Sequence, residues 1–130
     1  MRFLLDTMVF IGAYEGDLHR MPKRVQNILT NNDEDLSLSA LSLTEIAIKN
    51  SVGKLSFPLD RISKALEDLR IGIIPFENSD ARAFFSLPLF ADRRDPFDRM
   101  MIAQAMAEDM TMITADRLFG QYAGLRVLAA

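Results

Sequence analysis

Short apolar runs alternate with helix-like segments along this 130-residue chain, and no other feature constrains its fold as strongly. Runs typical of buried strands occur at residues 3–5, 36–41, 73–75 and 111–114, and an edge strand is expected over 125–128. Segments with the apolar spacing of helices lie between them. Strands that alternate with helices pair in parallel. The sequence therefore predicts one α/β domain over residues 1–130, with a parallel β-sheet flanked by helices on both faces.

Polar residues mark where several of these helices are expected to begin and end. Ser42 and Glu45 have the spacing of a capping box, which places Glu45 in the first turn of a helix that ends at Gly53. Asp60 and Ser79 are expected to cap the next two helices, because aspartate and serine side chains accept free backbone N–H groups at helix starts.

Five carboxylates fall where the chain leaves a strand or enters the next helix. Ligands of parallel sheets bind at this edge, because the carboxyl ends of the strands meet there. Asp98 shares a helix face with Met101 and Ile102, so its side chain is expected to lie among buried groups. Asp95 precedes Pro96 and is typical of a helix cap that accepts the N–H of Asp98. The five acids expected at this edge are Asp6, Glu45, Asp95, Asp98 and Asp116.

Carboxylates gathered at one edge repel one another unless protons or cations neutralise them. The chain has one histidine and no cysteine, so the available ligands are oxygens, and Mg²⁺ or Mn²⁺ is the expected ion. Such an ion activates a bound water and stabilises the charge that develops on a phosphate, which favours phosphodiester hydrolysis. Glu45, Asp95 and Asp116 each have an alternative role as a cap or turn residue, whereas Asp6 and Asp98 are hard to explain in that way, so the prediction depends on the convergence of all five.

The charge of the chain excludes one class of protein and leaves another open. A net charge of −3 argues against a general DNA-coating protein, but it permits a local basic rim around a site. Basic residues near the acids are expected either to form solvated ion pairs or to hold phosphates. The candidates for phosphate binding are Lys49, Arg94, Arg99 and Arg117.

Targeting signals are not evident in the sequence. Asp6 interrupts the first apolar run after three residues, so the segment MRFLLD does not have the pattern of a signal peptide. No window approaches the ~18 apolar residues of a membrane span. The absence of cysteine suits a reducing compartment, so the expected location is the cytoplasm, without membrane attachment.

Four stretches resemble the PIN domain, and more closely the VapC-type toxins of bacterial toxin–antitoxin pairs. They are FLLDT (3–7), LSALSLTEIAIKNSVGKL (38–55), RDPFDRMMIAQAMAED (94–109) and MITADRLFGQY (112–122), which leaves 13–35 and 56–92 unmatched. In that family a parallel-sheet domain cleaves RNA with Mg²⁺ or Mn²⁺ held by four acids. The resemblance places these catalytic and metal-binding roles on Asp6, Glu45, Asp98 and Asp116, with Asp95, Thr7 and Thr114 as additional supporting residues.

The resemblance also implies a homodimer and a cognate VapB-like antitoxin whose tail blocks the acidic cleft. Many relatives carry histidine at two positions where this chain has Met8 and Arg93, a departure that bears on substrate handling rather than on the metal acids. We therefore predict a metal-dependent endoribonuclease toxin. The alternatives are a PIN-fold housekeeping nuclease that matures or repairs nucleic acid, and a catalytically silent domain that binds a protein partner.

Overall fold

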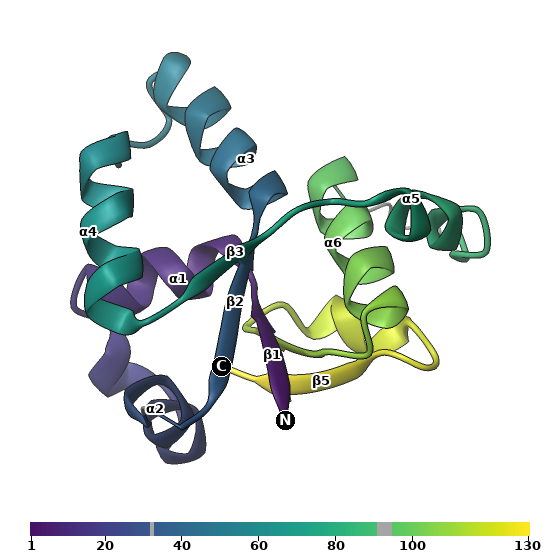
Figure 1. Ribbon diagram of the computed structural model, residues 1–130, viewed down its shortest axis with the longest axis horizontal. Helices are drawn as coiled ribbons and strands as arrows, with labels where there is room; N and C mark the ends of the chain where they lie inside the picture. Colours follow the sequence, from purple (N-terminus) through teal and green to yellow (C-terminus); the bar gives the residue numbers. More distant parts are fainter. Residues whose placement is uncertain (32, 91–94) are drawn as a thin grey trace.

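The computed structural model describes residues 1–31, 33–90 and 95–130 (Figure 1). These residues form a five-stranded parallel sheet in the order β3–β2–β1–β4–β5, which confirms the predicted α/β class. The strands are β1 (Arg2–Leu5), β2 (Asp35–Ser39), β3 (Gly72–Ile74), β4 (Thr111–Thr114) and β5 (Arg126–Ala129). The α-helices are α1 (Thr7–Tyr14), α2 (Lys23–Thr30), α3 (Ala40–Ser51), α4 (Leu59–Leu69), α5 (Asn78–Phe84) and α6 (Pro96–Ala107), and the short 3₁₀ helices are η1 (Leu18–Arg20) and η2 (Arg117–Gln121).

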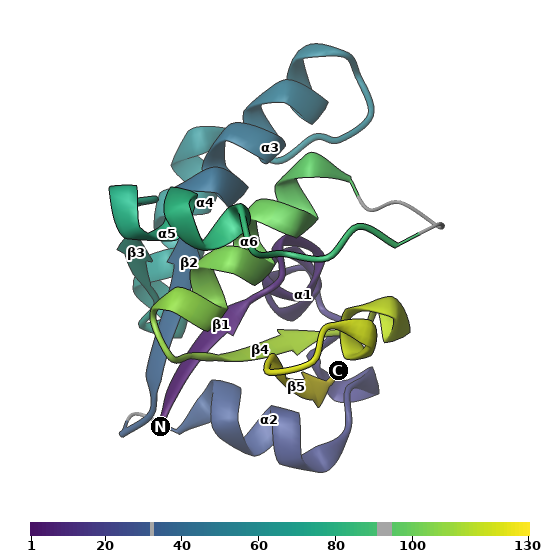
Figure 2. The ribbon, with the colours of Figure 1, turned by 90° about the vertical axis from the view of Figure 1, so that its right-hand side faces the viewer.

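The central strand β1 separates two apolar cores, because successive side chains of a strand point to opposite faces. Phe3 and Leu5 belong to a core built with α1, α2 and α4, whereas Leu4 belongs to a core built with α6. Figure 1 shows α1, α2 and α4 to one side of the sheet and α5 and α6 to the other, and Figure 2 shows α6 above β1 and β4. Helices thus cover both faces, as predicted.

The register of the central strands brings three chain segments out at one edge. Leu5 pairs with Leu38 of β2 and with Ile113 of β4. The N–H of Asp6 then donates to the carbonyl oxygen of Ile113 at 2.9 Å, which continues the pairing one residue past β1. The residues that follow β1, β2 and β4 consequently leave the sheet side by side.

Helix α3 begins earlier than the sequence predicts. Its N-cap is Ser39, whose hydroxyl accepts the N–H of Leu41 at 3.1 Å. The predicted capping box of Ser42 and Glu45 is therefore wrong: Ser42 is fully buried in the first turn, and Glu45 lies in the second. The local sequence offers serines at both positions, and the end of β2 at Ser39 decides between them.

The starts of α4 and α5 also differ from the prediction. Pro58 is the N-cap of α4, and Asp60 lies within its first turn. Glu77 caps α5, where the side chain of Asp80 accepts the N–H of Glu77 at 2.7 Å in a reciprocal capping box. Ser79 is therefore a residue inside α5.

In the described ranges, no helix combines the length and the apolar character needed to cross a membrane.

Candidate active site

A cleft of about 350 Å³ lies at the edge where β1 and β4 end. All five acids predicted for this edge line it, although they come from both ends and from the middle of the chain. The lining residues are Asp6, Met8, Glu45, Lys49, Asp95, Asp98, Ala115 and Asp116. We call this space the acidic cleft.

Asp6 occupies the N-cap position of α1, but its carboxylate does not cap the helix. Its side chain is buried, and Oδ2 accepts a hydrogen bond of 2.7 Å from the hydroxyl of Thr114. The same hydroxyl accepts the N–H of Asp116 at 3.1 Å, so Thr114 connects the acid after β1 to the acid after β4. Burial raises the pKa of Asp6; the hydrogen bond from Thr114 opposes this shift, and the charge of Glu45 adds to it.

Glu45 reaches the acidic cleft from the second turn of α3 and is held at both oxygens. Oε1 accepts a hydrogen bond of 2.7 Å from the hydroxyl of Thr7, and Oε2 lies 3.1 Å from Nζ of Lys49. Because Thr7 has a single hydroxyl proton, Ser42 can donate to Thr7 Oγ1 across their 2.7 Å separation. Thr7 therefore orients Glu45.

Ser42 is the residue of this arrangement that the sequence prediction missed. It lies on the helix face of Glu45, three residues earlier, and this spacing was the only available signal. Its contact with Thr7 joins residues 35 positions apart, so no local pattern reveals it.

Asp98 lies half-buried in the first turn of α6, on the same face as the fully buried Met101 and Ile102, as predicted. Burial raises its pKa to about 7, and the charges of the neighbouring acids shift the pKa in the same direction. An acid with this pKa is partly protonated near neutrality, and a cation that binds its carboxylate displaces the proton to solvent. The acids that raise the pKa of Asp98 are Asp6, Glu45, Asp95 and Asp116.

Asp95 is exposed and has the predicted capping position. Its Oδ1 accepts the N–H of Phe97 at 2.8 Å, rather than the predicted N–H of Asp98, and Pro96 is the first residue of α6. Asp95 therefore lines the acidic cleft and also caps α6.

Replacing Asp95 with alanine should lower the free energy of unfolding by about 1 kcal/mol, because the helix loses its capping acceptor. Asp95→Asn keeps a capping oxygen and should unfold like the unchanged protein. Urea denaturation of the metal-free protein measures both variants. An equal loss of stability in the two would show that the charge of Asp95, and not its cap, stabilises the fold.

The chemistry of the acidic cleft suits a hard divalent cation, since its available ligands are carboxylate oxygens. Within residues 1–31, 33–90 and 95–130, no group of three or more acidic or histidine side chains is arranged to hold a metal ion. Mutual repulsion keeps ionised carboxylates apart until a cation neutralises them, so binding would require side-chain movement toward the ion. The residues that could then hold it are Asp6, Glu45, Asp98 and Asp116.

The basic residues predicted to bind phosphate are placed differently from one another. Lys49 lines the acidic cleft. The guanidinium of Arg99 instead lies 4.7 Å from the ring centroid of Phe84 and donates to backbone carbonyls after α5, which does not support a phosphate-binding role. Arg117 is exposed at the start of η2 and is not part of the cleft lining. Arg93 and Arg94 lie outside the described residues.

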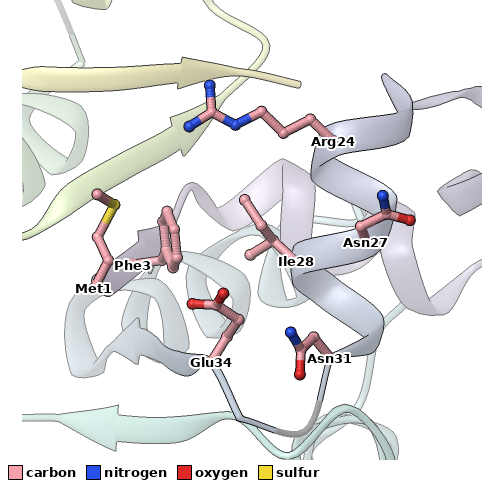
Figure 3. A pocket seen from close by; sticks show the side chains of 7 residues that line it. All are labelled: Met1, Phe3, Arg24, Asn27, Ile28, Asn31 and Glu34. Carbon is pink, nitrogen blue, oxygen red and sulfur yellow. The ribbon is translucent and has the colours of Figure 1, made fainter.

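A separate cavity of about 330 Å³ lies between α2 and the start of β1 (Figure 3). It shares no lining residue with the acidic cleft. Arg24 of α2 and Glu34 bring opposite charges to its lining, but none of the predicted site residues is present. The acids therefore distinguish the cleft at the other end of β1 as the candidate site.

Comparisons with known proteins identify relatives of this fold. The sequence matches the PIN domain over residues 3–125. Similar solved structures include VapBC2 from Rickettsia felis bound to a promoter DNA fragment, at 18% identity and a TM-score of 0.72, covering 99% of this chain and 98% of that chain. VapBC-1 from nontypeable Haemophilus influenzae is 17% identical with a TM-score of 0.71, again covering 99% and 98%. Comparison with curated proteins finds no match.

Proposed function

This chain belongs to the PIN domain family, and on that basis we propose that it is a metal-dependent endoribonuclease, the toxic component of a VapBC-type toxin–antitoxin pair. The observation that carries the proposal is the acidic cleft, in which acids from four separate segments face one another. The structural likeness to chains of VapBC complexes supports the choice of a toxin over other nucleases.

In this proposal Asp6, Glu45, Asp98 and Asp116 hold Mg²⁺ or Mn²⁺. When bound, the ion supplies a water of lowered pKa and neutralises the charge that develops on the attacked phosphate. The chain itself orients the ligands, because the hydroxyls of Thr114 and Thr7 fix one oxygen each of Asp6 and Glu45.

Lys49 has a second role in the proposal. Its ammonium lies 3.1 Å from Glu45 in the metal-free site and is partly exposed to solvent. A cation that neutralises Glu45 weakens this ion pair, so Lys49 becomes available to a phosphate of the RNA backbone. Lys49→Gln should therefore weaken RNA binding without weakening metal binding, because it removes a positive charge that competes with the ion for Glu45.

The proposal also specifies partners and a location. A cognate VapB-like antitoxin would block the acidic cleft, and a basic side chain has the charge to do so. We place the protein in the cytoplasm, where RNA is available, as a homodimer.

Cleavage of RNA by the purified protein tests the proposal directly. We expect cleavage with Mg²⁺ or Mn²⁺ and none with excess chelator. Cleavage that persists in the chelator would exclude metal dependence. Binding of Mn²⁺ without RNA cleavage would indicate a different substrate. A protein that neither binds the ion nor cuts RNA would fit the catalytically silent, protein-binding alternative.

Expression in bacteria tests the toxin assignment separately. Expression alone should stop growth, and co-expression of the small protein encoded next to it should restore growth. The matched control is Asp98→Asn at the same expression level, which should be harmless because it lacks one metal acid. A soluble enzyme that cuts RNA in vitro and leaves growth unchanged would favour the housekeeping nuclease.

A further inference from the structure

A second cleft, of about 280 Å³, adjoins the acidic cleft and shares Asp6, Met8 and Ala115 with it. We call it the side cleft. Much of its remaining lining comes from α1 and from the segment that follows α1. The residues that give this part its chemistry are Gly12, Asp17, Arg20 and Met21.

Hydrogen bonds to backbone carbonyl oxygens hold the wall of the side cleft in place. The N–H of Asp17 donates to Gly12 O at 2.8 Å, and that of Arg20 donates to Asp17 O at 3.0 Å. The side-chain amide of Gln26 donates to Met21 O at 2.7 Å. A Cβ built on Gly12 would lie 3.6 Å from Asp17 Oδ2 and 3.7 Å from Met21 Cε. The surface of the side cleft at Gly12 therefore lies next to these two side chains.

The side cleft combines a hydrogen-bond acceptor, a donor and polarizable apolar walls. Oδ1 of Asp17 lies 3.6 Å from Nη1 of Arg20, and both side chains are more than half exposed, at 54% and 75%, so a ligand can reach them. The thioethers of Met8 and Met21 can make favourable contacts with an aromatic ring.

Guanine is the RNA base whose groups match this set most fully. Its Watson–Crick edge carries two neighbouring N–H donors for a carboxylate, and its O6 and N7 acceptors form the commonest specific base contact of arginine. Adenine and cytosine each offer a carboxylate one amino group, and uracil offers one imide N–H.

We propose that the side cleft binds a guanine base next to the phosphodiester that is cut in the acidic cleft. Asp17 accepts from the N–H groups of guanine, and Arg20 donates to its acceptors. Because the two clefts share a wall, one nucleotide can place its base in the side cleft and its phosphate in the acidic cleft, with the ribose between them. Asp17, Arg20 and Met21 belong to segment 13–35, outside the stretches that carry the family resemblance, so this preference belongs to this chain and rests on the proposed nuclease function.

Cleavage of a random pool of short RNAs with Mn²⁺, followed by sequencing of the new ends, tests the proposal. The unchanged protein should favour guanine at one position beside the cut, and Asp17→Asn and Arg20→Gln should each reduce this preference on the order of tenfold. The controls are Asp33→Asn, an exposed acid outside both clefts, and Arg24→Gln in the cavity of Figure 3, which should keep it. Cleavage without any guanine preference would overturn the proposal.

Binding of single nucleotides to the metal-free protein provides a readout that does not need cleavage. Guanosine 3′-monophosphate should bind more tightly than cytidine 3′-monophosphate in a calorimetric titration. Gly12→Leu should abolish this difference in affinity, because the leucine side chain would occupy the side cleft. Gly12→Ala should keep the fold, since its Cβ makes ordinary contacts. Equal binding of the two nucleotides would reject the side cleft as a guanine site. Selective binding by a protein that cuts no RNA would instead reject the nuclease proposal and retain the guanine site.

Discussion

Asp98→Asn is expected to lower the rate of RNA cleavage roughly a hundredfold or more at saturating Mn²⁺, because a metal ion contributes several kcal/mol to phosphodiester cleavage. The substitution keeps the shape of the side chain but removes one of the four charges proposed to hold the ion. Cleavage rates measured on one RNA over a range of Mn²⁺ concentrations would separate weak metal binding from a lower maximal rate.

The same variant should make the metal-free protein more stable at alkaline pH. The pKa of Asp98 is about 7 in the folded protein against an ordinary value of 3.8, so the folded state binds this proton more tightly than the unfolded state. Stability should therefore fall as the pH rises from about 4 to about 7, and the loss should be complete above that range. Because Asp98 is only half-buried, solvent screening reduces the effect to roughly 2 kcal/mol.

Asp95→Asn is the matched control, since it makes the same chemical change three residues earlier in the same helix. It should retain most of the cleavage activity and show nearly unchanged stability. If Asp95→Asn abolished cleavage while Asp98→Asn still cut RNA, the roles of the two aspartates would be reversed. Metal-free melting curves of both variants at pH 5 and pH 8 would test the electrostatic part independently.

The fold could be predicted because its signals are local. The apolar runs 3–5 and 111–114 lie within β1 and β4, and the run 73–75 overlaps β3. The pair Asp95-Pro96 correctly predicts the start of α6. Helix starts were less predictable wherever two capping residues stood close together. Ser39 and Ser42 are one such pair, and the choice between them depends on where β2 ends, which the sheet determines.

The part of the site that follows from sheet topology could be predicted from the sequence, and the part that depends on side-chain packing could not. Parallel strands bring the residues after β1 and β4 to one edge, which is why the acids could be gathered from sequence alone. The hydroxyl contacts among Thr7, Ser42 and Glu45 depend on the packing of α1 against α3. Arg99 directly follows Asp98 in sequence, but its side chain lies over the ring of Phe84 and does not line the cleft.

Mn²⁺ is expected to raise the melting temperature of the metal-free protein by about 10 °C at 100 times its dissociation constant. Binding to the folded state alone adds ~2.7 kcal/mol at that concentration, and for a domain of this size each kcal/mol corresponds to roughly 4 °C. The acidic cleft provides the reason, because a divalent ion offsets the burial and the mutual repulsion of the carboxylates, which together raise the pKa values of Asp6 and Asp98. Thermal scans at constant ionic strength, with NaCl replacing MnCl₂ in the control, measure the specific effect.

The affinity for Mn²⁺ should also depend on pH in a way that identifies Asp98 as a ligand. With its pKa at about 7, Asp98 is mostly protonated at pH 6 and mostly ionised at pH 8. The ion must displace that proton, so the apparent dissociation constant should be about tenfold higher at pH 6 than at pH 8. Asp98→Asn should bind Mn²⁺ more weakly and lose most of this pH dependence, whereas Asp95→Asn should keep it. A dissociation constant that does not change between the two pH values in the unchanged protein would contradict Asp98 as a ligand with a pKa of about 7, because such a ligand must release a proton when the ion binds at pH 6.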